Sequence, residues 1–219
     1  MSKTTITQEQ EIVLSVIQEF LDQNRPFEEA TVVPYIQNKC TRSSINLSKQ
    51  GIKMILQDLI RKYYVVQGSK LSREKILKNQ NRRKIFNLIK NQPGIYFNRL
   101  VRRTKFANHV VSWHLNVLIK FNCVNKNTIG NHEVYYLSNV KFSNVKKHFY
   151  LSKRKGKEII QYFNAHLGEG ITKSRLEREL NTHYNTVSKY VDNFFELKIL
   201  KQENLENSTN YYLFNEVEL

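Results

Sequence analysis

The sequence predicts a mostly helical α+β fold in which short helices alternate with small β-hairpins. Apolar residues recur at spacings of three and four along most of the chain, as amphipathic helices require. Two segments alternate around turn-forming residues, as the strands of a hairpin do. The whole pattern then returns later in the chain, which indicates a repeated structural unit.

The repeat is clearest between the middle and the end of the chain. At a constant offset of 76, the matched residues are Gly94-Ile95, Leu100, Arg102, Val111-Ser112, Leu115, Leu118, Val124 and Tyr135-Tyr136-Leu137 against Gly170-Ile171, Leu176, Arg178, Val187-Ser188, Val191, Phe194, Leu200 and Tyr211-Tyr212-Leu213. The helix before them matches at an offset of 74, with Ile85, Phe86, Leu88 and Ile89 against Ile159, Ile160, Tyr162 and Phe163. The loop that follows is therefore two residues longer in the last unit.

In the middle unit the pattern predicts a helix, a short extended segment, two more helices and a hairpin. The expected ranges are 82–91, 95–97, 99–104, 108–121, and 123–128 with 133–138. Pro93-Gly94 ends the first helix, and Asn98 is a residue type that caps the second. The third helix follows a turn at Phe106-Ala107, and Gly130-Asn131 suits the turn of the hairpin.

The first unit follows the same order with more divergence. Ile52, Leu56, Leu59 and Val65 have the spacings of Val111, Leu115, Leu118 and Val124, at an offset of 59. Helices are expected at about 7–23 and 28–38, followed by a turn that residues 40–48 lengthen. The helix start at 72–75 leaves little room for a hairpin after Val65. We therefore predict tandem winged-helix modules, two clear and one diverged with a short wing, over residues 1–77, 78–150 and 151–219.

Positive charge is concentrated in the middle unit. The chain has 35 basic and 19 acidic residues, for a net charge of +16. Residues 1–77 hold 11 basic and 8 acidic side chains, residues 78–150 hold 14 and one, and residues 151–219 hold 10 of each. A general bias toward lysine would spread the excess, whereas here +13 falls on one unit. This distribution favours a polyanionic partner, and nucleic acid above all.

The sequence contains few features that would support another class of function. Cys40 and Cys123 belong to no CxxC motif or Cys/His cluster, so neither a zinc site nor a disulfide framework is expected. The motifs GxGxxG, GxxxxGK[ST], HExxH and GxSxG are absent. The expectation is a non-enzyme without cofactor, metal or membrane insertion. A cytoplasmic, nucleoid-associated location is also expected.

The stretch Val110-Val111-Ser112-Trp113-His114-Leu115-Asn116-Val117-Leu118 resembles the recognition helix of ArsR/MarR-type winged-helix regulators. The whole stretch of residues 93–137 is similar to these regulators, and two-module versions of it resemble archaeal transcriptional regulators. The resemblance covers roughly residues 79–219 and only weakly residues 1–77. It implies a regulator that places the third helix in the major groove of DNA. Metal sensing of the ArsR kind needs thiols on the third helix, and none is present there.

The third helix of the middle unit should therefore carry the residues that read bases. Val111, Leu115 and Leu118 are expected to point inward. The residues expected on the outer face or entry edge are Asn108, His109, Ser112, Trp113 and Asn116. Trp113 could equally be a partly buried packing residue, and His114 is expected to be a structural histidine with its hydrogen bonds satisfied.

Cations around this helix should bind phosphates and set the register. On the second helix and turn these are Arg99, Arg102, Arg103 and Lys105, and in the wing they are Lys126 and His132. The corresponding residues of the last unit are Lys173, Arg175, Asn185, Thr186, Ser188 and Lys189, with Asp192 in place of Asn116. The first unit offers Lys49, Gln50, Lys53, Met54 and Gln57 to DNA or to a partner.

The leading hypothesis is a sequence-specific double-stranded DNA-binding transcriptional regulator. The first and last units would bind DNA, a protein partner or a second copy of the chain. The alternative is a winged-helix scaffold of the ESCRT-II-like or RNA polymerase-associated kind. That alternative explains the neutral last unit but not the charge of the middle one.

Overall fold

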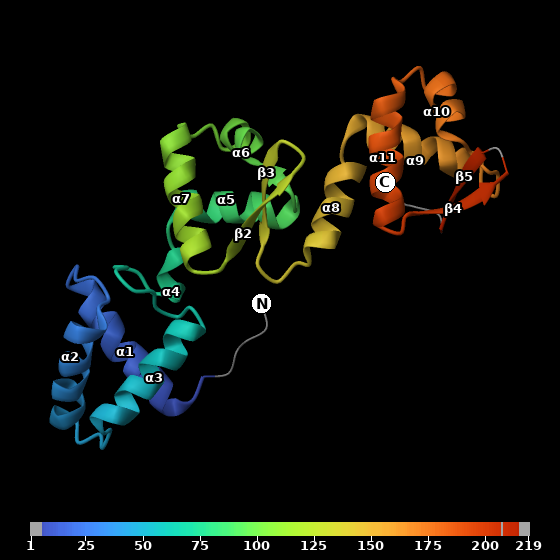
Figure 1. The fold of residues 1–219 in the computed structure, drawn as a ribbon. Coiled ribbons are helices and arrows are strands. Elements are labelled where there is room, and N and C mark those ends of the chain that lie inside the picture. The colour runs from blue at the N-terminus through green and yellow to red at the C-terminus, as the bar shows by residue number, and fades with distance from the viewer. Residues whose placement is uncertain (1–5, 207, 215–219) are drawn as a thin grey trace.

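Three helical units follow one another along an elongated chain, which the computed structural model describes over residues 6–206 and 208–214. In Figure 1 the first unit lies at the lower left, the second in the centre and the third at the upper right. The fold is α+β with small antiparallel sheets, as predicted from the repeated pattern of helices and hairpins. Among the described helices, none combines the length and the apolar character needed to cross a membrane.

The first unit packs α1 (Gln8–Asp22), α2 (Glu29–Arg42) and α3 (Lys49–Arg61) around one apolar core. Thr7 and Gln10 form a capping box at the start of α1, and Ser48 caps α3 by accepting a hydrogen bond from the Gly51 amide. No strand occurs in the described residues between α3 and α4 (Arg73–Ile76).

The second helix of this unit is longer than predicted. It runs to Arg42, whereas the sequence pattern placed its end near residue 38 and a turn over 40–48. Cys40 is 2% exposed and lies one turn after the buried Ile36, so it continues the apolar face of the helix. The turn is thereby shortened to residues 43–48.

The middle unit contains α5 (Gln80–Asn91), β1 (Ile95–Tyr96), α6 (Phe97–Thr104), α7 (Asn108–Lys120), β2 (Val124–Ile129) and β3 (His132–Leu137). The strands form an antiparallel sheet in the order β1-β3-β2. The prediction that Asn98 caps the second helix was wrong, because α6 already begins at Phe97 with Tyr96 before it. Asn79 is the residue that caps α5, by accepting a hydrogen bond from the Arg82 amide.

The third unit repeats this order with α9 (Arg154–Ala165), α10 (Lys173–Glu179), α11 (Tyr184–Glu196), β4 (Leu200–Leu205) and β5 (Ser208–Leu213). Ile95 pairs with Tyr135, and 76 residues later Ile171 pairs with Tyr211. Gly94 has a left-handed backbone with φ of 86°. In the third unit the glycine with the same backbone conformation is Gly168, with φ of 85°, and not the aligned Gly170. The two additional residues of the last unit therefore lie between Gly168 and Ile171.

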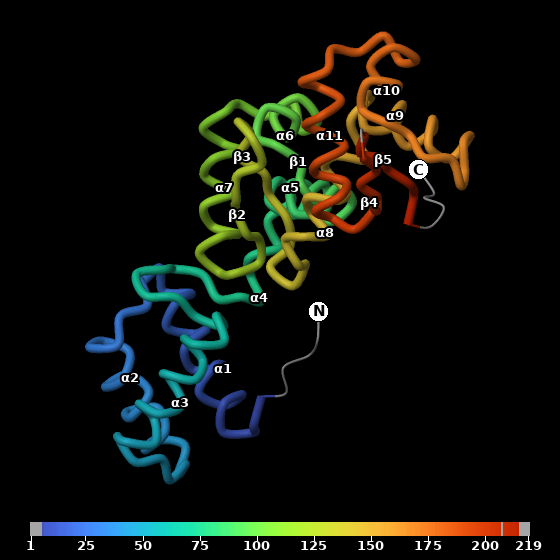
Figure 2. Tube along the Cα trace, turned by 45° about the vertical axis from the view of Figure 1, so that its right-hand side comes forward, coloured from blue at the N-terminus to red at the C-terminus, as the bar shows by residue number. Residues whose placement is uncertain are grey.

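A helix that the sequence pattern did not predict, α8 (Phe142–Leu151), lies between the middle and third units (Figures 1 and 2). It packs closely on Gly94, where an added Cβ would come within 3.2 Å of Val145 Cγ1. The outer face of the β2–β3 hairpin packs on the same helix, so that Ile129, Val134 and Tyr136 share one apolar core with the third unit. The two units are thus joined by a continuous core.

The first and middle units meet through the segment before α5. Val66, Leu71 and Ile76 pack into the core of the middle unit. Ser72 donates a hydrogen bond to the Gln18 side chain, and Lys75 forms an ion pair with Asp22. Helix α4 therefore packs with the middle unit, although it lies within residues 1–77 of the sequence.

Candidate nucleic-acid interface

The third helix of the middle unit, α7, has one buried and one uncovered face. Val111, Leu115 and Leu118 are at most 2% exposed, which confirms the predicted inner face. On the outer face Asn108, His109 and Asn116 are exposed, Ser112 is half-buried, and Trp113 is 55% exposed. The outer face is therefore open to a ligand, and about half of the Trp113 surface is exposed on it.

The beginning of α7 offers unoccupied main-chain donors. Ala107 occupies the N-cap position, and no side chain caps the helix. The first turn also carries no acidic residue. A helix start of this kind presents N–H groups and the positive end of the helix dipole, which favour an anion.

Beneath the outer face lies a buried arginine, Arg82, which is not among the predicted site residues. Arg82 of α5 is 2% exposed, and its Cζ lies 5.2 Å from the centre of the Trp113 ring. One guanidinium nitrogen donates a 2.9 Å hydrogen bond to the Ile76 carbonyl, while Nε has no partner in the described part of the chain. Burial lowers the pKa of Arg82.

The position of Arg82 has a signal in the sequence. It precedes Ile85, Phe86 and Ile89 by three, four and seven residues, so it lies on the apolar face of α5. An arginine at such a position can pack its methylenes in the core and direct its guanidinium toward an aromatic ring. Helical spacing thus indicates burial here, whereas a count of charges does not.

His114 neighbours both residues and is buried at 3% exposure, as predicted. The expectation that its hydrogen bonds are satisfied was wrong for Nδ1, which has no partner among the described residues. Burial lowers the pKa of His114, and the positive charge of Arg82 lowers it further. The imidazole is therefore neutral at neutral pH, and it packs edge-on against Trp113 with ring centres 4.8 Å apart.

The cations of α6 lie on two flanks of that helix. Arg102 is exposed and donates a 3.3 Å hydrogen bond to the Tyr96 hydroxyl, and Lys105 is exposed just after the helix ends. Arg99 and Arg103 instead line a pocket that faces α8. Among the described residues, none of these four cations forms an ion pair with a carboxylate, so their charge is available to an anion.

The two predicted phosphate-binding residues of the wing both have contacts within the protein. Lys126 is exposed but forms a 2.8 Å ion pair with Glu133, and that hydrogen bond holds the pKa of Glu133 below its usual value. His132 is exposed, yet its ring lies 5.2 Å from Tyr96 and 6.0 Å from Phe149. The wing tip adjoins α11, since a Cβ added to Gly130 would lie 3.9 Å from Lys189 Nζ.

In the third unit, several side chains corresponding to the candidate site are occupied internally. Lys173 Nζ donates to Ser188 Oγ at 2.9 Å and to Asp192 Oδ1 at 2.5 Å, and Ser188 donates to the same carboxylate. Arg175 bonds Glu169 at 2.9 Å, which raises the pKa of this arginine, and it also bonds Tyr162. Asn185 and Lys189 remain exposed, and Thr186 is half-buried.

The first unit presents α3 with an exposed Met54, 63% accessible, beside the exposed Lys49, Gln50 and Gln57. Lys53 is half-buried. Toward the end of α3, Asp58 binds Lys62 and Arg61, and these hydrogen bonds lower its pKa to about 2. Two cations at the end of this helix therefore share one carboxylate.

The comparison with family models concerns the middle unit. The family model HTH_HVO_0163_N, described as an N-terminal HTH (helix-turn-helix) domain, matches residues 79–149. A protein of Methanocaldococcus jannaschii, named as an uncharacterized HTH-type transcriptional regulator, is 28% identical over 146 residues. That match covers 65% of this chain and 36% of the relative, so the chain spans about a third of that protein. The segment of the chain that holds α5, α6, α7 and the wing is thus similar to a family of helix-turn-helix domains.

Proposed function

We propose that this chain is a transcriptional regulator that binds specific sequences of duplex DNA by placing α7 in the major groove. The observation that carries the proposal is the uncovered polar face of α7 within a unit of net charge +13. The helix-turn-helix family match over residues 79–149 and the name of the archaeal relative support DNA binding and regulation. The proposal takes residues 1–77, 78–150 and 151–219 as three modules.

Within the middle module, the side chains divide by role. Asn108, Ser112 and Asn116 are assigned to base edges, where an asparagine amide can pair bidentately with adenine. Arg102, Lys105 and the free amides at the start of α7 are assigned to phosphates, which fix the register without reading the sequence. Lys126 and His132 would contact a neighbouring stretch of backbone.

The third module is proposed to contribute less to DNA binding than the middle module does. Lys173, Arg175 and Ser188 would have to leave the internal contacts described above before binding a phosphate or a base. Asp192 would repel phosphates at the position that Asn116 occupies in the middle module. Asn185, Thr186 and Lys189 remain as its candidate DNA contacts, with Lys189 next to the wing of the middle module.

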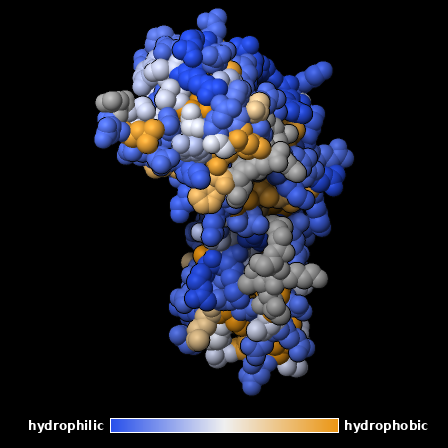
Figure 3. All heavy atoms as spheres, turned by 90° about the vertical axis from the view of Figure 1, so that its right-hand side faces the viewer, coloured by the Kyte–Doolittle hydropathy of each residue, from blue (hydrophilic) through white to orange (hydrophobic). Residues whose placement is uncertain are grey.

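A second candidate role, protein contact, is favoured by the surface of this third module. Figure 3, which views the molecule from that side, shows small hydrophobic patches in a mostly hydrophilic surface. The large hydrophobic residues exposed in this module are Leu167, Tyr184, Phe195, Leu205 and Phe214. Together with the zero net charge of residues 151–219, they suit a protein partner or a second copy of the chain better than a polyanion.

The primary test is the affinity of the full chain for a labelled duplex, measured by fluorescence anisotropy over a series of salt concentrations. The Arg102→Gln/Lys105→Gln variant should weaken binding to every sequence. It should also flatten the slope of log K against log salt by about 1.8, since each phosphate contact contributes about 0.9. A charge-matched control, Lys70→Gln/Lys198→Gln, removes two exposed lysines outside the middle module and should leave the slope unchanged. Equal slopes in all three proteins would refute the proposal.

Sequence reading is tested separately by selection of preferred duplexes from a random pool. The Asn108→Ala/Asn116→Ala variant should lose the preference of the wild type while keeping its affinity for random duplex. Circular dichroism should show an unchanged fold, because both side chains are exposed. An unchanged selected motif would contradict the placement of α7 in the groove.

A further inference from the structure

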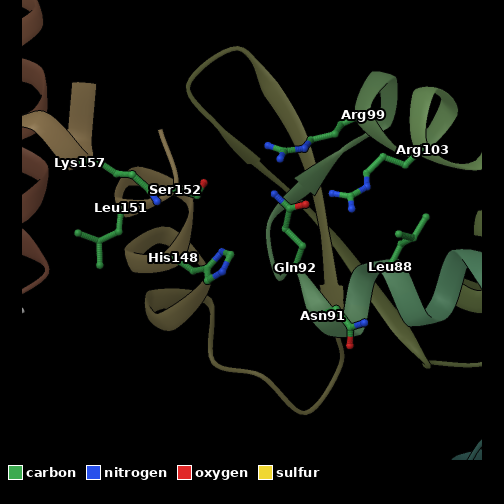
Figure 4. A pocket seen from close by; sticks show the side chains of 9 residues that line it. All are labelled: Leu88, Asn91, Gln92, Arg99, Arg103, His148, Leu151, Ser152 and Lys157. Atoms are coloured by element: carbon green, nitrogen blue, oxygen red, sulfur yellow. The ribbon is translucent and has the colours of Figure 1, made fainter. Parts of the chain in front are cut away.

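A pocket of about 520 Å³ lies away from the outer face of α7, between the middle unit and the helices that follow it. Arg99 and Arg103 reach into it from α6, and His148 and Lys157 approach it from α8 and α9 (Figure 4). Leu88 and Leu151 provide apolar wall on the two sides. The lining therefore combines positive charge from both units with some hydrophobic surface.

The charge of this pocket is uncompensated. No residue lining it carries a carboxylate, and Arg99, Arg103 and Lys157 form no ion pair in the described part of the chain. The carboxylates of the neighbouring segments are engaged elsewhere, since Glu133 pairs with Lys126 and Glu158 pairs with Lys155. Three cations and an imidazole line the same space, and their mutual repulsion is relieved when an anion enters.

The chemistry of the donors indicates what kind of anion fits. Arg99 and Arg103 are one helical turn apart on the same flank of α6, so their planar guanidinium groups can bind neighbouring oxygens of one anionic group. Lys157 adds a point charge from the opposite wall, and the amides of Asn91 and Gln92 add neutral donors. In Figure 4 the Gln92 amide lies between the two arginines and the His148 ring. Such a set of several cations and amides suits phosphate better than a single carboxylate.

We propose that this pocket binds a small molecule that carries phosphate groups. Its volume lies in the range of about 300–1,000 Å³ that small-ligand sites occupy. The leucines offer apolar contacts to the rest of such a ligand, whereas a bare phosphate would leave them unused. The walls belong to two units, so the ligand is held between them, while the open face of α7 remains free for a duplex. The site does not depend on the DNA-binding function proposed above.

A ligand in this pocket also connects α6 to α8 and α9. Binding therefore stabilises the arrangement in which the middle and third units lie together. Because α6 is the helix before α7 in the helix-turn-helix pair, occupancy of the pocket is positioned to alter how that pair meets its own ligand.

The test is isothermal titration calorimetry of the full chain with inorganic triphosphate. The expected result is saturable one-to-one binding that the Arg103→Gln/Lys157→Gln variant weakens at least tenfold. The control, Lys141→Gln/Lys147→Gln, removes two exposed charges outside the pocket, one at the N-cap position before α8 and one within that helix. It should change the dissociation constant less than threefold. Circular dichroism of each variant checks the fold. Absence of saturable binding to the wild type, or equal losses in both variants, overturns the proposal.

A second arm separates a small molecule from the phosphates of a nucleic acid. Lys157 lies outside the middle unit. The single substitution Lys157→Gln should therefore weaken triphosphate binding while leaving the affinity for a labelled duplex unchanged. If it weakens both to the same degree, the pocket is a part of a nucleic-acid path and the small-molecule assignment is wrong. Triphosphate binding without any duplex binding would support the pocket and refute the DNA-binding proposal, so the two can fail independently.

Discussion

Arg82 lies beneath Trp113, with its guanidinium carbon 5.2 Å from the centre of the indole ring. The same guanidinium donates a hydrogen bond to the carbonyl of Ile76, the last residue of α4. One buried side chain therefore supports the exposed ring on α7 and also holds the end of α4 against α5. Four predictions test this arrangement and the packing around it.

The first concerns Arg82 itself. Arg82→Ala should lower the free energy of unfolding by about 2 kcal/mol, because it removes packing, a buried hydrogen bond and a cation–π contact. Arg82→Met keeps most of the apolar stem and also removes a desolvated charge, so its loss should be smaller. Urea unfolding of both variants measures the difference. Equal losses in Arg82→Met and Arg82→Ala would show that the packed stem contributes little and that the groups lost in both variants, the hydrogen bond and the cation–π contact, carry the effect.

Trp113 gives the second prediction, because it is the one tryptophan in the sequence. At 55% exposure its fluorescence should be quenched readily by acrylamide in the free protein. A duplex placed on α7 should protect the ring and shift its emission. The control is Lys173→Gln, which changes the third unit and should leave the signal intact. Duplex binding seen by anisotropy without any change in tryptophan emission would place the DNA elsewhere.

The third prediction concerns pH and follows from His114. Burial lowers its pKa in the folded protein, so the unfolded chain binds more protons than the folded one below the ordinary value near 6.5. Stability supplied by the neutral imidazole is therefore complete above that value and is lost as pH falls toward the folded pKa. Unfolding free energies at pH 7.5, 6.5 and 5.5 should decline by at most about 1.4 kcal/mol per pH unit from this group.

The matched variants for this prediction are His114→Gln and His109→Gln. His114→Gln should flatten the decline between pH 7.5 and 5.5, whereas His109→Gln changes an exposed residue and should retain it. Identical pH dependence in the wild type and in His114→Gln would show that His114 is not the group responsible.

The fourth prediction compares two glycines. A Cβ at Gly156 would come 2.0 Å from the Tyr150 carbonyl oxygen, so Gly156→Ala must separate α9 from the end of α8. Gly168 has φ of 85° and nothing within 4 Å of its added Cβ, so Gly168→Ala costs only backbone strain, on the order of 1 kcal/mol. Thermal unfolding should show a clearly larger loss for Gly156→Ala. Equal losses would mean that the junction of α8 and α9 relaxes without disturbing the packing.

Helical and hairpin spacing predicted much of the fold. The third helix of the middle unit was expected at 108–121 and runs from Asn108 to Lys120, and the inner face at Val111, Leu115 and Leu118 is confirmed. This periodicity is a reliable signal because a helix on the surface of a protein must bury one of its faces. The ends of elements were less accurate, as α6 and α2 show, since caps and chain reversals depend on neighbours that local spacing does not reveal.

The contacts between units were beyond the reach of that reasoning. Helix α8 was missed because it follows the hairpin directly and has no counterpart in the repeat alignment. A signal for its packing did exist in β3, where Val134, Tyr135 and Tyr136 are all buried. An unbroken apolar run in a strand indicates that both faces are covered. Tyr135 lies on the opposite face, in the core of the middle unit, where burial together with Glu133 raises its pKa to about 12.

The candidate site was predicted only as far as helix faces allow. The outward positions of Asn108, His109 and Asn116 follow from the spacing of the buried residues. Other features depend on tertiary neighbours that the sequence does not reveal. Arg99 and Arg103 face a pocket that Arg102 does not, Lys126 pairs with Glu133, and Lys173 pairs with Asp192. Their roles in binding remain predictions for the variants described above.

The core that the β2–β3 hairpin shares with the third unit determines where the chain can be divided. The family match ends at residue 149, inside α8. A fragment cut there would leave Ile129, Val134 and Tyr136 without most of the apolar residues that cover them, and it should aggregate or unfold. The smallest fragment expected to remain folded therefore runs from Val66 through β5, and dissection experiments should remove the three helices of the first unit while keeping the other two units together.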